Sequence, residues 1–563
     1  MPVIRVNIRD LESLLGRSLS RDMIIKYLAI LKCEVEGFVE ETLEYEANHD
    51  RPDIFSAEGL ARALRGILGD TSLRYTIRPS TVKAFSDSVP GRPYVALAVV
   101  RDLELNEEAV SQIMQLQEKL ASTYGRNRRK ASIGVYDLDK IKPPIKYTLA
   151  DPSSTKYIPL NEKEEMTLLE VLEKTEKGRM YGHIISHMNK YPVLVDSTDT
   201  ILSLVPILNA DYNKVTPKTR NILIDSTGTD PGLVADMVTL MALNIAERSR
   251  TGVVEEVQVV YPDNTVISAP RKSRREIHVD LREVSALLGV EIRVDDALDA
   301  LRRCYYEVSQ GDDILIVKPP VFRIDVKTWV DVAEDIATIY GYDRIGMEAN
   351  SLPPTKTVGR IHPLEYLSNK IRETFIQLGF TEVANYMMSN EYLQAELFGR
   401  EKRVFKVQNP RSEKYTCLRT WLAPGLLEVV QANAEKKSKI YIFEVGDVAF
   451  PSESNEVVEE RRAGFAISHP NATLTDGLAY ARAVLNELSL KPSFKKARVS
   501  GFLEERTASI LVDEVEVGFV GEVHPRILQE LGLQNPVVIG EIYLNRVLAL
   551  IASNQEHTRK ANN

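Results

Sequence analysis

Two stretches of this chain match each other, and this internal repeat constrains the fold more than any other feature. Residues 6–35 align without gaps with residues 279–308, at an offset of 273. Both copies predict a strand, a short helix that ends at glycine, a second helix and a strand. The matched residues of the first copy are Val6, Ile8, Leu14, Leu15, Gly16, Leu28, Glu34 and Val35. Their counterparts are Val279, Leu281, Leu287, Leu288, Gly289, Leu301, Glu307 and Val308.

The match resumes after a one-residue slip. Residues 51–54 then face residues 323–326, and each segment is followed by a predicted helix, Ser56 to Leu68 in the first copy and Lys327 to Tyr340 in the second. Two small modules therefore flank an unrelated middle. The duplicated module is either a structural scaffold or a ligand-binding unit. The repeat does not decide between the two, because a fold does not determine a function.

Length and composition agree with a multidomain globular protein. At roughly 150 residues per domain, 563 residues indicate about four domains. We predict an α+β chain with parts at residues 1–85, 91–262, 270–350 and 358–563. With 27% charged residues and no apolar run of roughly 18, it is not expected to be an integral membrane protein.

Charge, cysteine usage and the start of the chain narrow the setting further. The formal net charge of -9 means that any RNA contact must be local. Cys33, Cys304 and Cys417 lie far apart, which argues against disulfides and a cysteine-based zinc site. With no signal peptide recognised at the start, we expect a reducing, cytoplasmic setting.

The second copy of the repeat carries a group of acidic residues. Asp325 precedes a predicted helix with Asp331, Glu334 and Asp335, whose spacing places the last three on one helical face. Like charges at these spacings repel each other. The cluster is therefore either a solvated acidic face or a site for a hard cation such as Mg²⁺, which prefers oxygen ligands.

Polar residues in the middle gather near predicted strand ends. Residues 91–262 predict a mixed α/β region with a strand at Pro93 to Val100 and a helix at Asn106 to Thr123. Polar side chains around its Gly and Pro turns are candidates for a binding pocket, although turn chemistry is the simpler explanation for any one of them. They are His183, Asn209, Asp211, Asp225, Thr227 and Thr229.

Two short basic runs are candidates for phosphate contact. They are residues 126–130, with the sequence RNRRK, and residues 271–275, with the sequence RKSRR. Neither is interleaved with aromatic residues, so each is also explained as a solvated loop. The second run is also placed as a linker into the second repeat copy.

The last part predicts one large α+β domain after the prolines at 353 and 354. Its expected elements include a helix at His362 to Leu378, a strand at Val383 to Met388 and a second strand at residues 440–446. The β runs that follow indicate an antiparallel sheet.

Four strings resemble phenylalanyl-tRNA synthetase β subunits of the archaeal and eukaryotic type. They are residues 48–59, with NHDRPDIFSAEG, residues 131–139, with ASIGVYDLD, residues 323–343, from RID through ED to YGYD, and residues 409–446, from NP through LRT to FEVG. In order they span nearly the whole chain, and its length is similar to that form.

The resemblance implies a partner and a metal. In this family the β chain assembles with a catalytic α subunit as an α₂β₂ enzyme that joins phenylalanine to tRNA(Phe), with ATP and phenylalanine bound by the α subunit. The family's Mg²⁺ site, shared with the α subunit, would fall on Asp325, Asp331, Glu334 and Asp335.

The resemblance also implies roles for the other parts. The last domain looks like a class II synthetase catalytic fold without its chemistry, because Glu444 stands in the FEVG string and residues 518–521 lack the GxGxxR form. Adenylation by this chain alone is therefore not expected. The middle resembles the family's editing domain, which hydrolyses mischarged Tyr-tRNA, and His183, Asn209, Asp211, Asp225 and Thr227 are the candidate catalytic residues.

Two other functions remain open. A stand-alone hydrolase of mischarged tRNA would need only the middle part. A non-catalytic scaffold that binds RNA or protein would need neither editing nor metal.

Overall fold

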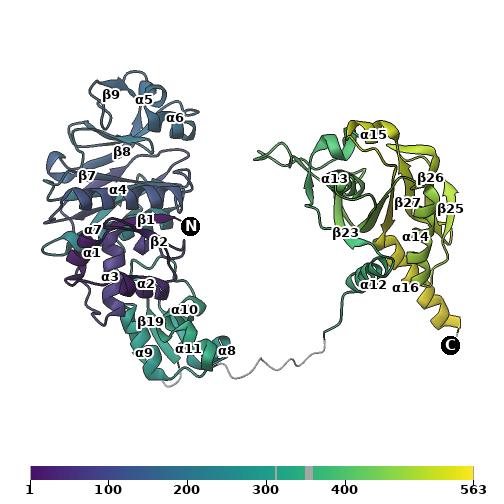
Figure 1. The fold of residues 1–563 in the computed structure, drawn as a ribbon. Helices are drawn as coiled ribbons and strands as arrows, with labels where there is room; N and C mark the ends of the chain where they lie inside the picture. The colour runs from purple at the N-terminus through teal and green to yellow at the C-terminus, as the bar shows by residue number, and fades with distance from the viewer. Residues whose placement is uncertain (1, 311–313, 349–358, 562–563) are drawn as a thin grey trace. The chain divides into compact units, whose positions relative to one another are not determined.

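The internal repeat folds as two copies of one small module in the computed structural model, which describes residues 2–310, 314–348 and 359–561 (Figure 1). Each copy has a three-stranded antiparallel sheet with its last strand in the centre, in the orders β1-β3-β2 and β17-β19-β18. The first copy contains β1 (Val3–Asn7), α1 (Ile8–Leu15), α2 (Arg21–Ile30), β2 (Glu34–Val39), β3 (Thr42–Glu46) and α3 (Ala57–Ile67). The second contains β17 (Ile277–Asp280), α8 (Leu281–Leu288), α9 (Val294–Arg303), β18 (Glu307–Gln310), β19 (Ile314–Lys318), α10 (Trp329–Tyr340) and α11 (Tyr342–Glu348).

The predicted element order of the repeat is confirmed. In both copies the short helix is capped at its start by a side chain, Asn7 or Asp280, and ends at a left-handed glycine. Gly16 and Gly289 share a φ of 74°, a conformation that is unfavourable for residues with a Cβ atom. The glycines therefore set the same turn into the second helix of each copy.

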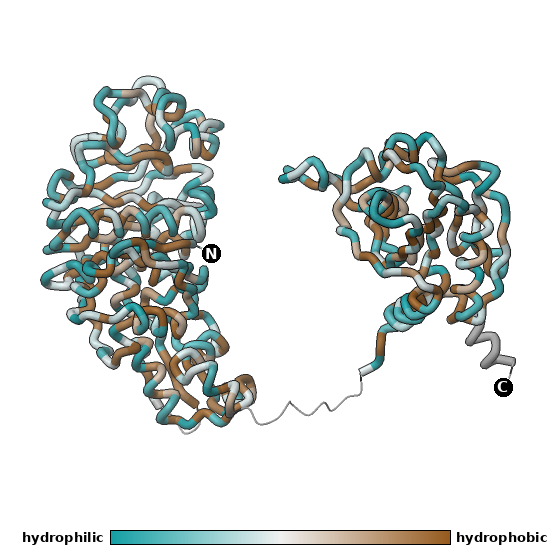
Figure 2. Tube along the Cα trace, in the orientation of Figure 1, coloured by the Kyte–Doolittle hydropathy of each residue, from teal (hydrophilic) through white to brown (hydrophobic). Residues whose placement is uncertain are grey.

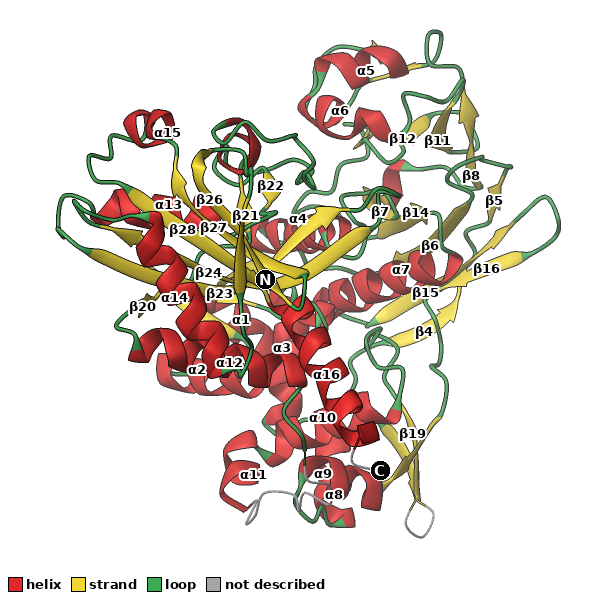
Figure 3. Cartoon of the chain, turned by 90° about the vertical axis from the view of Figure 1, so that its right-hand side faces the viewer, coloured by secondary structure: helices red, strands yellow, loops and turns green. Residues whose placement is uncertain are grey.

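The middle forms an eleven-stranded sheet with α4 and α7 packed along strands β6, β7 and β14 (Figure 3). Its strands are β4 (Thr76–Pro79), β5 (Ala84–Ser86), β6 (Tyr94–Val100), β7 (Ala131–Asp137), β8 (Ile145–Ala150), β11 (Tyr191–Val195), β12 (Ile201–Leu204), β13 (Leu208–Asn209), β14 (Ile222–Gly228), β15 (Val253–Val260) and β16 (Val266–Ala269). The helices are α4 (Glu107–Ser122), α5 (Leu168–Lys174), α6 (Glu176–Tyr181) and α7 (Pro231–Ile245), and β9 (Lys156–Tyr157) pairs with β10 (Met166–Thr167) separately.

This sheet curls until its two ends meet. Strands β13 and β7 stand at opposite ends of the strand order, yet the Asn209 amide on β13 donates a hydrogen bond to the Val135 carbonyl on β7 at 3.2 Å. Tyr136 on β7 likewise reaches Ser203 on β12. The two ends of the sheet are therefore joined by side-chain hydrogen bonds and not by a backbone strand ladder. This incomplete closure leaves space between β7 and strands β12 and β13.

Buried ion pairs join the first copy to the end of α7. Arg248, in the 3₁₀ turn Ala246–Arg248, donates two hydrogen bonds to Asp10 on α1, at 2.9 and 2.7 Å, and one to Glu58 on α3. Arg65 on α3 donates to Glu247 at 2.6 Å. All of these charged groups are buried, so removing one partner would leave the other as an unfavourable unpaired charge.

The second unit, Thr355–Asn563, is built on a seven-stranded sheet in the order β20-β23-β24-β28-β27-β26-β25. Hydrophobic segments gather on its inner strands and inward helix faces (Figure 2). Its strands are β20 (Thr381–Glu382), β21 (Met388–Ser389), β22 (Cys417–Leu418), β23 (Ile440–Pro451), β24 (Val457–Ser468), β25 (Ser493–Lys496), β26 (Phe502–Val512), β27 (Val515–Val523) and β28 (Val537–Tyr543). The helices are α12 (Pro363–Gln377), α13 (Ala423–Asn433), α14 (Leu474–Glu487), α15 (Pro525–Glu530) and α16 (Leu544–Ala561).

One predicted element of this unit is wrong. Residues 383–387 form no strand, and only the two-residue strands β20 and β21 lie on either side. The Asn385 backbone and amide both donate hydrogen bonds to the buried Glu444 carboxylate, at 3.3 and 2.8 Å. These bonds hold the segment in an irregular path that its apolar residues alone do not reveal.

Two further findings concern membranes and cysteines. Among the described residues, every helix is too short or too polar to cross a lipid bilayer. Cys33, Cys304 and Cys417 are free thiols, and burial raises the pKa of Cys33 and Cys304 to about 12.

We expect Arg248→Ala to lower the free energy of unfolding by about 3–5 kcal/mol, because it leaves Asp10 and Glu58 buried without a counter-ion. Arg250→Ala is the matched control, since Arg250 is 68% exposed and pairs with an exposed Glu104, and it should cost less than about 1 kcal/mol. Urea unfolding followed through Trp329, with Trp421 replaced by Phe in every sample, measures both. Equal effects of the two variants would contradict the role of the buried pairs.

Candidate functional site

A cavity of about 410 Å³ lies where the two ends of the curled sheet meet. Strands β7, β12, β13 and β14 form its walls, and residues of α4 and α6 complete the rim. Its volume falls in the range of about 300–1,000 Å³ that is typical of small-molecule pockets. The incomplete closure of the sheet therefore produces a binding cavity.

Asp225 is the buried acid of this cavity. It lies on β14, is 2% exposed, and accepts a hydrogen bond from the Tyr136 hydroxyl at 2.6 Å. The same hydroxyl lies 3.0 Å from the Ser203 hydroxyl. Gly134 on β7 pairs with Asp225 on β14. A Cβ atom at Gly134 would come within 2.2 Å of both the Asp225 carboxylate and the Tyr136 oxygen. Only glycine therefore leaves room for this contact.

Burial raises the pKa of Asp225 to about 6, although the Tyr136 hydrogen bond and the nearby Arg92 guanidinium lower it in part. A carboxyl group that titrates near neutral pH is suited to accept and return a proton during hydrolysis. Arg92 is itself buried, and its guanidinium donates to the Thr227 hydroxyl at 2.9 Å and to Ser132 at 2.8 Å. The acid thus stands near a fixed positive charge.

The structure brings two of the five predicted catalytic residues together. Asn209 and Asp225 both line the cavity. Thr227 is buried behind it and accepts from Arg92, while Asp211 pairs with Lys214 at 3.0 Å. His183 is exposed in the 3₁₀ turn Gly182–Ile184 and does not line the cavity.

Sequence reasoning missed Tyr136, Ser203 and Gly134 as cavity residues. Tyr136 and Gly134 belong to the string at residues 131–139, where alternate residues of a strand share a face. That periodicity alone indicates that they point the same way. The pairing of Gly134 with Asp225 is a contact between distant segments and has no local signal.

The first basic run forms a strained turn immediately before β7. Arg126, Asn127 and Arg128 have φ values of 49°, 53° and 64°, so three consecutive residues with side chains are left-handed. This conformation costs about 1–2 kcal/mol per residue. The Arg128 guanidinium holds the turn by donating to the Pro206 and Ile207 carbonyls at 3.1 and 2.9 Å, and Arg92 donates to the Arg128 carbonyl at 2.9 Å.

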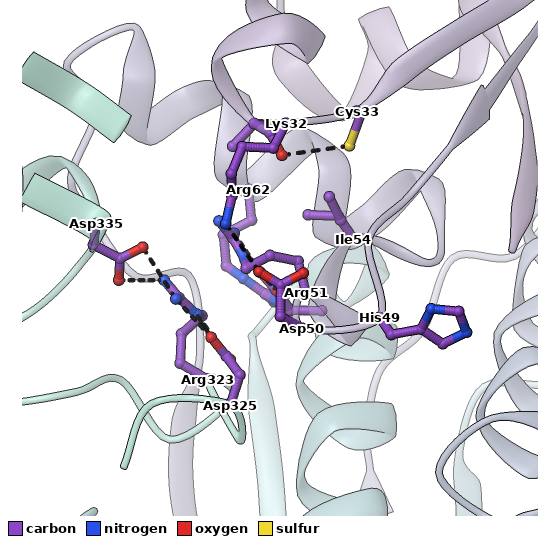
Figure 4. A network of polar contacts seen from close by, with 12 residues as sticks. Lys32, Cys33, His49, Asp50, Arg51, Ile54, Arg62, Arg323, Asp325 and Asp335 are labelled. Carbon is purple, nitrogen blue, oxygen red and sulfur yellow. Dashed lines mark hydrogen bonds and ion pairs between the residues drawn. The ribbon is translucent and has the colours of Figure 1, made fainter. Parts of the chain in front are cut away.

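Two acidic residues of the second copy, Asp325 and Asp335, are separated by Arg323 (Figure 4). Arg323 pairs with Asp325 and with Asp335, at 2.7 Å each, and the Tyr306 hydroxyl also donates to Asp335 at 2.6 Å. Burial raises the pKa of Asp325 even though Arg323 lies beside it. A guanidinium group therefore occupies the place between these two carboxylates.

The other two acids have different surroundings. Asp331 caps the start of α10, where it accepts from the Lys327 and Thr328 backbone at 2.8 and 2.7 Å. Glu334 is 44% exposed and pairs with Lys32 of the first copy, which also contacts Asp50 at 2.9 Å. The described residues contain no group of three or more acidic, histidine or cysteine side chains arranged to hold a metal ion. The four carboxylates have the chemistry of a magnesium site, but they do not converge as one in this chain.

Comparisons with known proteins decide the family. Three family models match, described as "Phenylalanyl tRNA synthetase beta chain CLM domain" at residues 349–544, "tRNA synthetase B5 domain" at 277–342 and "B3/4 domain" at 106–253. The phenylalanine–tRNA ligase beta subunit of Thermofilum pendens is 40% identical over 97% of this chain and 98% of its own length. This chain belongs to the phenylalanine–tRNA ligase β-subunit family. It is therefore a subunit of an aminoacyl-tRNA ligase.

Further relatives of the family agree. The beta subunit from Pyrococcus furiosus is 36% identical over 97% of this chain and 99% of its own length. The crystal structure of an N-terminal fragment of the Pyrococcus horikoshii phenylalanyl-tRNA synthetase beta subunit is 39% identical, with a TM-score of 0.58. It covers 61% of this chain and 100% of the fragment. The cavity lies within the B3/4 match and Asp325 to Asp335 within the B5 match.

The region of the second unit around Glu444 is filled by internal contacts. Glu444, 3% exposed on β23, accepts from Arg419 at 2.5 Å and from Asn385. The cavity that Asn385 and Arg419 line measures about 70 Å³, well below the size of typical ligand pockets. Arg419 is thus neutralised within the fold.

The raised pKa of Asp225 predicts a pH dependence of stability. Folding favours its protonated form, so the stabilisation is fully present below the ordinary pKa of about 4 and is lost as the pH rises through about 6. The difference of about two pKa units corresponds to roughly 3 kcal/mol. Urea unfolding of the wild type and Asp225→Asn between pH 4 and 7.5 should show the wild type losing about this much relative to the variant. Parallel pH profiles would contradict the burial of a titrating acid.

Proposed function

We propose that this chain assembles with a catalytic α subunit as an α₂β₂ enzyme that joins phenylalanine to tRNA(Phe). The α subunit binds ATP and phenylalanine. The main support is the similarity to phenylalanine–tRNA ligase beta subunits over 97% of this chain. The Glu444–Arg419 pair adds that this arginine is not free to bind phosphates, whereas adenylation needs positive charge around them. We also propose that the chain has four domains, at residues 1–85, 91–262, 270–350 and 358–563. The last of these is an inactive class II synthetase-like domain.

Mixing the chain with a cognate α subunit tests this assembly. Size-exclusion chromatography with light scattering should give a mass near α₂β₂, and tRNA(Phe) should be charged only when both chains are present. We further expect Asp331→Ala with Glu334→Ala to weaken assembly at least tenfold. The lone chain should lose only about 1–2 kcal/mol of stability, because the variant removes the cap of α10 and the pair of the exposed Glu334 with Lys32. Arg293→Ala with Asp296→Ala on the same module is the control. Unchanged assembly of the α10 variant would remove that face from the interface.

Magnesium binding at Asp325, Asp331, Glu334 and Asp335 is proposed for the assembled enzyme alone. The carboxylates suit a hard cation, but Arg323 and Lys32 hold three of them in the lone chain. A partner chain would have to add ligands and draw Lys32 away from Glu334. Mn²⁺ electron paramagnetic resonance of the chain with and without α tests this, and equal binding in both would contradict it.

We propose that the cavity hydrolyses tRNA(Phe) mischarged with tyrosine, as a second sieve for an added hydroxyl group. Asp225 accepts a proton from water, the water oxygen attacks the ester carbonyl, and the proton passes to the ribose oxygen as the ester C–O bond breaks. Tyr136 orients the acid through its hydrogen bond to Asp225, and Ser203 in turn contacts the Tyr136 hydroxyl. The support is the coincidence of a buried acid, a near-neutral pKa and a pocket of suitable volume.

Hydrolysis of Tyr-tRNA by the full chain tests the editing role. Asp225→Asn should lower kcat/KM by about 100-fold or more, within the range for loss of a general base, and Tyr136→Phe by less. His183→Ala is the control, because this exposed residue lies outside the cavity, and its rate should stay within about twofold of the wild type. If the His183 variant lost hydrolysis and the Asp225 variant kept it, the hydrolytic site would lie outside this cavity. Hydrolysis without any α-dependent charging would favour a stand-alone hydrolase.

A further inference from the structure

A hollow of about 600 Å³ opens at the strained turn, and we call it the basic hollow. Its lining residues are Arg126, Asn127, Arg129, Lys130 and Thr229. Arg126 and Arg129 are exposed, and within the described residues neither guanidinium has a hydrogen-bond or ion-pair partner. The Lys130 ammonium group lies 3.5 Å from the Asp230 carboxylate, and the two form an ion pair. The hollow is thus positive in a chain whose net charge is -9.

The side chains, not the backbone, are free to bind a ligand here. The N–H groups of residues 126–130 all donate to backbone carbonyls of the turn or of residues 121–123 at the end of α4, for example from Lys130 to the Gly125 carbonyl at 2.9 Å. A solvated loop would not need three left-handed residues held by two buried arginines, Arg92 and Arg128. Such strain, when it is fixed by surrounding structure, is typical of sites that present side chains in a set direction.

The basic hollow lies at the end of the same two strands that wall the cavity. Gly134 on β7 pairs with Asp225 on β14, Ala131 pairs with Gly228, and the next residues along, Lys130 and Thr229, line the hollow. Four residues of strand separate Asp225 from Thr229, which is roughly 13 Å. Arg128 itself lines the cavity while its neighbours Asn127 and Arg129 line the hollow, so the two places adjoin through the turn.

We propose that the basic hollow binds the backbone phosphates of the single-stranded 3′ end of tRNA while the aminoacyl group lies in the cavity. Arginine is suited to this role because its planar group donates two parallel hydrogen bonds to phosphate. Contacts of this kind position a nucleic acid without reading its sequence. The proposal rests on the hydrolytic function proposed for the cavity, and it assigns Arg126 and Arg129 as binding residues.

Fluorescence anisotropy with a 5′-labelled RNA hairpin that ends in single-stranded ACCA tests the proposal on the full chain. Arg126→Gln with Arg129→Gln should weaken binding about tenfold near 0.1 M salt. The slope of log affinity against log salt should fall by about 1.4, since each phosphate contact on a single strand contributes about 0.7. The same variant should show a raised KM for Tyr-tRNA hydrolysis.

Two matched variants separate position from charge. Arg126→Lys with Arg129→Lys keeps both charges and should recover most of the affinity. Lys272→Gln with Arg275→Gln removes the same charge from the other basic run, whose two residues are exposed, and should bind like the wild type. Circular dichroism melting confirms that all variants fold.

The outcomes distinguish this proposal from the hydrolytic one. Normal hairpin binding and KM in the Arg126 and Arg129 variant, or equal loss in the Lys272 and Arg275 variant, would overturn the basic hollow as an RNA site. No measurable hairpin binding by the wild type at low salt would do the same. Loss of RNA affinity in a chain that does not hydrolyse Tyr-tRNA would instead leave the hollow standing and remove the editing function.

Discussion

The first unit depends on buried arginines that need buried carboxylates. Arg248 at the end of α7 joins α1 and α3 by pairing with Asp10 and Glu58, and Arg65 on α3 returns to Glu247. Because an unpaired buried charge is strongly unfavourable, α7 can occupy one position relative to the first copy of the repeat. α7 itself packs on strands β6 and β14 of the curled sheet. The ion pairs therefore fix the sheet, and the cavity at its ends, to the repeat.

The two copies share a scaffold but expose different helices. Arg51 pairs with Asp53 in the first copy as Arg323 pairs with Asp325 in the second. In the first copy Gly59, Arg62 and Ala63 stand where the second has Asp331, Glu334 and Asp335. Gly59 has no room for a side chain, since a Cβ atom would lie 1.6 Å from the Asp53 carbonyl oxygen. The first helix is buried by close packing, whereas the second keeps Glu334 at the surface, with 44% of its side chain exposed.

The sequence could predict features that depend on neighbouring residues, such as helices, strands and their order. Matched residues gave the element order of both copies, and the glycines gave the end of the short helix in each. The acidic spacing correctly placed carboxylates on one helix, but it carried no information on Arg323 or Lys32, which approach from other segments. Asp225 was predicted from its place on a polar strand end. Its partners Tyr136 and Gly134 depend on strand register, which pairs residues about 90 positions apart.

Gly134 also limits how this pocket can evolve. Any other residue at that position would displace either the Asp225 carboxylate or the Tyr136 hydroxyl, so gradual change there is blocked by steric exclusion. Asn209 lies across the pocket on β13, the edge strand of the sheet, and its amide contacts the Val135 carbonyl instead of the acid. New substrate preferences would therefore arise from that edge, while the wall that carries the acid stays unchanged.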